Sequence, residues 1–114
     1  MRDDTERLLD ILEAIERIEK YAVYGYERFE RDELVQTWII HYVQIVGEAT
    51  AQLSDELCSA NPQVPWRQIV AMRNILVHVY SGVDPNEVWV VVERDIPILR
   101  VQVQAILQAQ GASD

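Results

Sequence analysis

The chain has 114 residues, the length of a single domain with one hydrophobic core. Its apolar fraction of 49% is that of a globular protein and argues against disorder. A net charge of −9 argues against binding of duplex DNA through a broad basic face, because phosphate contacts dominate the affinity of such proteins.

The first third of the chain predicts two helices. Asp3 and Glu6 have the spacing of a helix-capping pair, and apolar residues then recur at helical spacing to about residue 22. Gly25 and the polar run 27–32 break this pattern. A second, longer helix is predicted from about Asp32 to Leu57.

Gly47 lies inside that second predicted helix. A glycine there costs about 1 kcal/mol relative to alanine, so its presence suggests that another backbone approaches closely.

The clearest loop is the segment 61–65, and Pro65 can occupy the first turn of a third helix that runs over about 65–80. A fourth helix is predicted to start at residues 84–87, where an Asp cap, a Pro and a Glu follow each other. The run 88–92 has strand propensity, but the strong cap and the lack of a partner strand favour helix.

Pro97 predicts a kink or a restart before a last helix that ends near residue 108. Four to five helices with short connections indicate an all-α, antiparallel helical bundle, with residues 1–114 as one domain.

Polar chemistry is concentrated in the third predicted helix. Arg73, Asn74, His78 and Tyr80 fall within eight positions of an otherwise apolar segment. Asn74 and His78 lie one helical turn apart, and Arg73 and Tyr80 lie two turns apart. One reading is a catalytic or binding site. The other is that these are a solvated arginine, a polar filler and two residues at the edge of the core.

The surroundings of these four residues favour the first reading. The chain carries 19 acidic residues, yet none lies between positions 58 and 83. The only formal charges in that window are those of Arg67 and Arg73. A permanent cation and a titratable imidazole in an acid-free segment are suited to an anionic substrate.

The remaining candidates are weaker. His41 is expected to be structural, Cys58 an inert small residue, and Glu48 a solvated or capping residue. The three tryptophans fall on helical core stripes and are expected to pack. Two histidines and one cysteine make a metal site within the chain improbable, and no cofactor-binding motif is present. A single cysteine fits a reducing cytoplasm, and no run of about 18 apolar residues predicts a membrane span.

The spacing Arg73-Asn74-x-x-x-His78-x-Tyr80 resembles the R-x4-H-x-Y motif of the HepT-like toxins of the HEPN superfamily. Residues 45–49 resemble the I-G-E-A segment of that family, and residues 64–74 resemble its P-W-x-x-I-x-x-M-R-N stretch. With later landmarks, the likeness extends over roughly residues 5–108. Val79 departs from the pattern, because many relatives carry Asp there.

The resemblance implies a HEPN-type helical bundle that acts as a metal-independent ribonuclease toxin of a type II toxin–antitoxin pair. It implies a homodimer whose motif helices face each other across a cleft. The implied partners are an RNA substrate, with tRNA among the options, and a minimal nucleotidyltransferase (MNT) antitoxin that adds AMP to Tyr80. The alternative is a non-catalytic helical module that binds such a nucleotidyltransferase.

The residue types suit this chemistry. RNA cleavage without a metal needs proton transfer groups and a cation for the developing phosphorane charge. His78 can transfer protons near neutral pH, Arg73 can clamp a phosphate with two hydrogen bonds, and Asn74 can orient either group. One chain offers a single motif histidine, so a composite site in a symmetric dimer is expected. Arg67 is a candidate RNA contact.

Overall fold

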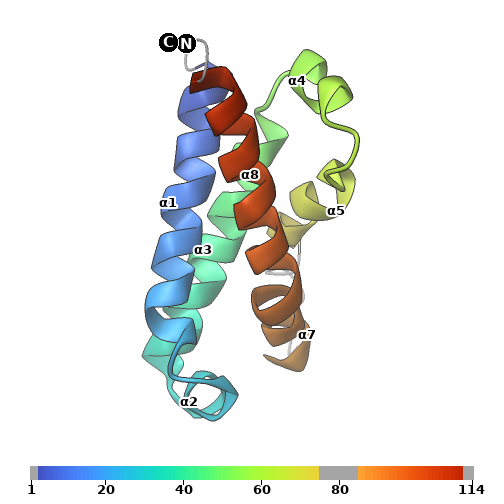
Figure 1. The fold of residues 1–114 in the computed structure, drawn as a ribbon. Coiled ribbons are helices and arrows are strands. Elements are labelled where there is room, and N and C mark those ends of the chain that lie inside the picture. Colours follow the sequence, from blue (N-terminus) through green and yellow to red (C-terminus); the bar gives the residue numbers. More distant parts are fainter. Residues whose placement is uncertain (1–2, 75–84, 112–114) are drawn as a thin grey trace.

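The computed structural model describes residues 3–74 and 85–111, and the regular secondary structure in these ranges is helical (Figure 1). This confirms the predicted all-α class. In chain order the helices are α1 (Asp4–Ala22), α2 (Tyr26–Arg31), α3 (Glu33–Ala51), α4 (Asp55–Ala60), α5 (Trp66–Val70), α7 (Pro85–Val90), the π-helix η1 (Val91–Asp95) and α8 (Ile96–Gly111).

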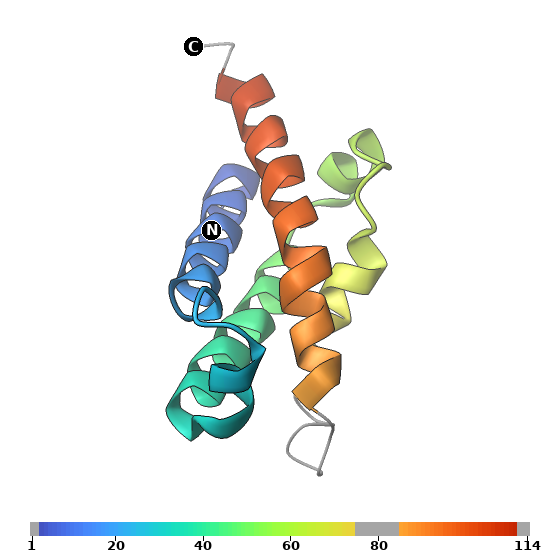
Figure 2. The same ribbon diagram turned by 60° about the horizontal axis from the view of Figure 1, so that its bottom comes forward.

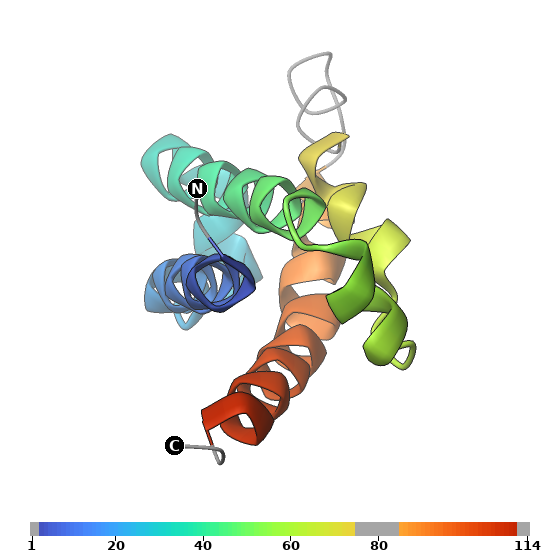
Figure 3. The same cartoon turned by 90° about the horizontal axis from the view of Figure 1, so that it is seen from above.

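Three long helices form the body of an elongated molecule that measures 45 × 26 × 25 Å. α1 and α3 run antiparallel and share the most extensive helix–helix contact, and α8 packs along α1 (Figure 1). Seen from above, α1 and the α4–α5 segment lie on opposite sides of α8 (Figure 3). The short α2 lies at the end of the bundle where α1 passes into α3.

The core follows the helical periodicity of the sequence. α1 buries one stripe of apolar residues at three- and four-residue intervals, which places them on one face of the helix. α3 and α8 supply the facing stripes, and the burial of these side chains is the main source of stability. The central members have at most 1% of their surface exposed: Leu8, Ile11, Ile15, Ile18, Ile39, Val43, Val46, Ile96, Leu99 and Val103.

The prediction of one helix from Asp32 to Leu57 is wrong at its end. α3 stops at Ala51, and α4 begins after Ser54. The Asp4 carboxylate, from the start of α1, accepts hydrogen bonds from the Ser54 backbone N–H at 2.9 Å and from the Ser54 hydroxyl at 2.6 Å. The Ser54 Oγ in turn accepts from the Leu57 N–H at 3.1 Å, which caps α4. A contact from 50 residues away thus stabilises the break.

Residues 27–31 of the predicted break at 27–32 belong to the short helix α2. Gly25 precedes α2 with φ of +89°, a backbone conformation that other residues rarely adopt. Asp32 ends α2 and caps α3, since its carboxylate accepts from the N–H groups of Leu34 at 3.0 Å and Val35 at 3.3 Å.

The segment 88–92 is helical, as predicted, despite its strand propensity. The last helix, α8, begins at Ile96 beside Pro97, as the predicted restart requires, but α7, η1 and α8 follow each other without a non-helical residue between them (Figure 2). The backbone N–H of Ile96 bonds to the Val91 carbonyl, the wider spacing of a π turn. A proline in a continuous α-helix clashes with the carbonyl four residues earlier, and a π turn at this place relieves that conflict.

No helix in the described ranges is long and apolar enough to cross a membrane.

The clamp between Asp4 and Ser54 should contribute measurably to stability. We expect Asp4→Ala to lower the free energy of unfolding by about 2 kcal/mol, because two charge-assisted hydrogen bonds are lost. Urea unfolding followed by circular dichroism measures this change. Glu16→Ala, at an exposed position of the same helix, is the control and should stay within about 0.5 kcal/mol of the wild type. Equal stability of the two variants would show that the clamp is dispensable.

Candidate active site

The segment that carries Arg73 is a helix with an interruption. α5 ends at Val70, Ala71 forms a turn, and the backbone is helical again over 72–74. The described part of the predicted helix over about 65–80 is helical over 66–70 and 72–74 with a turn at Ala71, and its part from residue 75 onward lies outside the described residues. The Asn74 N–H donates to the Ala71 carbonyl at 2.9 Å, which closes the tighter turn at the interruption.

Two of the four predicted site residues can be placed. Met72 points into the core with 3% of its surface exposed, whereas Arg73 and Asn74 are exposed. Both polar side chains are therefore accessible to a ligand. His78 and Tyr80 lie outside the described residues, so their predicted roles remain predictions.

Gly47 brings α3 into backbone contact with the Arg73 segment. A Cβ atom at position 47 would lie 2.6 Å from the Arg73 backbone nitrogen and 3.1 Å from both the Arg73 Cβ and the Val70 carbonyl oxygen. No side chain fits at 2.6 Å from a backbone atom without movement of one helix. The predicted close approach of a backbone at Gly47 is confirmed, and its partner is the segment with the candidate phosphate clamp.

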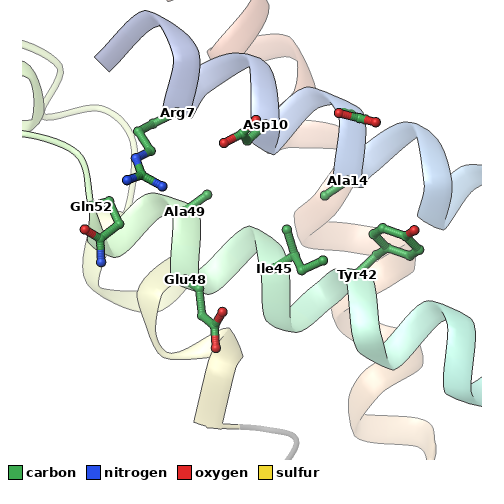
Figure 4. A pocket seen from close by; sticks show the side chains of 9 residues that line it. Arg7, Asp10, Ala14, Tyr42, Ile45, Glu48, Ala49 and Gln52 are labelled. Atoms are coloured by element: carbon green, nitrogen blue, oxygen red, sulfur yellow. The ribbon is translucent and has the colours of Figure 1, made fainter. Parts of the chain in front are cut away.

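Glu48 is the neighbour of this contact. It is exposed, and its Oε1 accepts a hydrogen bond from the Gln44 side-chain nitrogen at 3.3 Å. Figure 4 shows its carboxylate directed away from α1, on the side of α3 where the α5 segment passes. Glu48 thus stays within reach of solvent next to the helix crossing.

A groove of about 560 Å³ lies between α1 and α3 (Figure 4). It has an apolar floor and a rim that contains three carboxylates and one guanidinium. That charge balance repels phosphates, so this groove is not suited to a polyanionic substrate. The lining residues are Arg7, Asp10, Glu13, Ala14, Tyr42, Ile45, Glu48, Ala49 and Gln52.

Arg67 is exposed on α5, in the acid-free segment that precedes Arg73. Its neighbour Trp66 is partly buried against the core, which agrees with a packing role. Trp66 also lines a second groove with Arg67 and Gln68, a feature that we did not expect from the sequence. The sequence does contain a hint of this groove, because Trp66 lies next to Arg67 in a segment without carboxylates.

The weaker candidates have ordinary surroundings. His41 is exposed and packs edge-on against Tyr42 at a centroid distance of 4.9 Å, so it is not part of the core. Partial burial, with the carboxylates of Asp4 and Asp55 nearby, raises the pKa of the Cys58 thiol. The thiol is therefore protonated at neutral pH and a poor nucleophile. Among the described residues no cluster of His, Cys, Asp and Glu could hold a metal ion.

Comparison with known proteins agrees with this architecture. The model of one protein family, ribonuclease HepT-like, matches residues 11–106, which include both the Gly47 crossing and the Arg73 segment. The chain belongs to the HepT-like ribonuclease family. The resemblance suggested by the motif is thereby confirmed at the level of the family.

Curated members of the HepT-like family match over most of their length. A Methanocaldococcus jannaschii protein, whose name designates it a candidate RNase, is 31% identical over 92% of this chain and 97% of its own. "Probable ribonuclease HepT" of Thermococcus cleftensis is 37% identical over 87% of this chain and 91% of its own. A further candidate RNase, from Caldanaerobacter subterraneus, is 34% identical over 75% of this chain and 77% of its own. No solved structure matches the chain.

The crossing at Gly47 gives a direct test of the site's architecture. We expect Gly47→Ala to lower the free energy of unfolding by about 1–3 kcal/mol, because the new methyl group displaces the Arg73 backbone or α3. Chemical unfolding measures the loss, and amide hydrogen exchange over 66–74 reports the local displacement.

The matched control for this test is Gly111→Ala, at the end of α8, where an added Cβ meets nothing within 4 Å. It should be neutral or slightly stabilising, because alanine has the higher helix propensity. If both substitutions had the same effect, the close approach at Gly47 would not constrain the Arg73 segment.

Proposed function

We propose that this HepT-like chain is a metal-independent ribonuclease, which cuts within RNA or trims its end, and acts as the toxin of a toxin–antitoxin pair in the cytoplasm. The main support for this proposal is that the chain belongs to the ribonuclease HepT-like family. It is supported by the exposed Arg73, which belongs to a stretch without carboxylates in a chain of net charge −9. A segment without carboxylates favours binding of a phosphodiester, and the acidic residue that the structure places beside this segment is Glu48 of α3, next to the crossing.

In the proposed reaction the 2′-hydroxyl of the RNA attacks the adjacent phosphorus, and the bond from phosphorus to the 5′-oxygen breaks. One His78 imidazole takes the proton of the 2′-hydroxyl, and an imidazolium gives a proton to the leaving 5′-oxygen. Arg73 stabilises the charge that builds up on the non-bridging oxygens, and Asn74 orients the phosphate or the imidazole. The products are a 2′,3′-cyclic phosphate and a 5′-hydroxyl.

The proposed reaction needs two proton-transfer groups, whereas each motif contains one histidine. A homodimer with two-fold symmetry brings a second His78 and a second Arg73 to a shared cleft, so we assign the active site to the dimer interface. This arrangement also doubles the cations that face the RNA. Both motifs would have to face the two-fold axis for such a cleft to form.

The proposed inhibitor is a nucleotidyltransferase antitoxin that transfers AMP to the Tyr80 hydroxyl. Tyr80 is two residues from His78 in the sequence. A bulky, anionic nucleotide at that position would occupy Arg73 and exclude RNA. Modification of one tyrosine would then suffice to inactivate the toxin.

The activity test is cleavage of total RNA in the presence of EDTA. We expect the unmodified wild type to leave 2′,3′-cyclic phosphate ends, and Arg73→Ala and His78→Ala each to lose at least about 100-fold in rate. Arg94→Ala is the matched control, because the Arg94 side chain is 73% exposed and lies in η1, outside the motif segment. It should cleave like the wild type.

Cleavage that requires added metal, or that survives both Arg73→Ala and His78→Ala, would contradict the proposed mechanism. If wild type and variants were all inactive although Tyr80 carried no AMP, the alternative of a non-catalytic module for a nucleotidyltransferase would replace it.

Inhibition through Tyr80 predicts a specific chemical change. Incubation with ATP and the cognate nucleotidyltransferase should add one AMP to the wild type and abolish cleavage. Tyr80→Phe should cleave RNA but resist both modification and inhibition. Intact-mass spectrometry and the same RNA assay measure the two effects. AMP found on Tyr42 or Tyr24, which are also present in the chain, with no loss of activity would exclude this form of regulation.

A further inference from the structure

A groove of about 490 Å³ lies where the end of α4 meets the start of α5. Its lining combines an aromatic residue, a cation, a hydroxyl and an amide, and it contains no carboxylate. Arg67, Gln68 and Ser59 are all exposed there, so their polar groups are available to a ligand. The complete lining is Cys58, Ser59, Pro65, Trp66, Arg67 and Gln68.

Trp66 is held rigidly in this groove. Its indole N–H donates to the backbone carbonyls of Cys58 at 3.1 Å and Asn61 at 2.9 Å. The Asn61 side-chain nitrogen in turn donates to the Leu57 carbonyl at 2.9 Å. These bonds attach α5 to the end of α4 and fix the orientation of the ring. An aromatic surface that is already ordered loses little entropy when a ligand stacks on it.

Charge distinguishes this groove from two larger ones on the described surface. The groove between α1 and α3 is lined by three carboxylates and one arginine, and a groove of about 520 Å³ beside Trp38 is lined by the ion pair of Arg28 and Asp32. Asp55 and Glu56, in the first turn of α4, are not among the lining residues of the Trp66 groove, although the carboxylates of Asp4 and Asp55 lie near Cys58 at its α4 end. In a chain of net charge −9, a groove with one arginine and no acid favours an anionic, aromatic ligand.

We propose that the Trp66 groove is a subsite for a nucleotide of single-stranded RNA on either side of the cleavage position. The base stacks on Trp66, the Arg67 guanidinium binds the adjoining phosphate, and Ser59 and Gln68 bond to the base edge or the sugar. This assignment rests on the proposed ribonuclease function and extends it, because it names the surface that retains the substrate.

The position of the groove along the chain fits this assignment. Arg67 and Arg73 are six residues apart, about 9 Å if the rise of an α-helix is applied, and no carboxylate lies between them in the sequence. Along α5 itself no acidic residue separates the Trp66 groove from the Arg73 segment, and Asp95 of η1 lines the adjoining groove with Gln68 and Met72. Stacking is tolerant of base identity, so the subsite would favour unpaired over duplex RNA and discriminate weakly among bases.

The first test measures binding of a fluorescent single-stranded oligoribonucleotide by anisotropy, with His78→Ala as the common background to prevent cleavage. Arg67→Gln should weaken binding about tenfold and reduce the slope of log K against log salt by about 0.7, the value for one lost phosphate contact. Arg31→Gln removes the same charge from an exposed position of α2. It should bind like the parent.

A second pair of variants tests the requirement for an acid-free groove. Gln68→Glu introduces a carboxylate beside Arg67 and should weaken binding about tenfold. Gln52→Glu makes the same change in the groove between α1 and α3 and should have little effect. An oligonucleotide that carries 5-bromouridine should cross-link to Trp66 under ultraviolet light, and peptide mass spectrometry locates the adduct.

If the parent binds RNA while Arg67→Gln and Gln68→Glu bind as tightly as their controls, the subsite is refuted and the ribonuclease proposal stands. If none of the proteins binds RNA and the wild type does not cleave it, the proposed function itself fails. Cross-links at Trp38 instead of Trp66 would also refute the assignment.

Discussion

The crossing of α3 and the Arg73 segment at Gly47 is the constraint on which the site depends. The backbone nitrogen of Arg73 occupies the space that a side chain at position 47 would fill. At so short a distance the two segments have one relative position and little freedom to slide. The exposed Arg73 therefore projects from a backbone that the main core holds in place, as its proposed role as a phosphate clamp requires.

The α4–α5 segment is attached to that core at its start, through Ser54 and Asp4, and at its end, where Val70 and Arg73 meet α3 at Gly47. The Asp4–Ser54 hydrogen bonds join α4 to the start of α1, and the indole of Trp66 joins α5 to the carbonyls that end α4. Between these points the segment contributes few buried residues, namely Leu57, Val64 and Ile69. Hydrogen bonds therefore hold the α4–α5 segment in place, because its few buried side chains would not be enough.

The acidic residues and the arginines are also distributed unevenly along the chain. Six of the 19 acidic residues lie in α1, two in α3 and none in α8, whereas residues 58–74 carry two arginines and no acid. If the proposed function holds, the acidic parts of the described surface would repel RNA and residues 58–74 would not. Such a distribution limits indiscriminate binding and is consistent with an enzyme that acts on single-stranded substrate presented to a composite site.

The sequence by itself determined the helical class and most helix positions, because apolar periodicity and the caps at Asp3 and Asp32 are local signals. It also determined the family, through the motif that contains Arg73 and Asn74. Only the tertiary structure decided where α3 ends, since the Ser54 cap is completed by Asp4, 50 residues away. The partner of Gly47 and the groove at Trp66 were likewise decided by packing. Each arises where segments distant in the sequence meet, and no local pattern of residues specifies such a meeting.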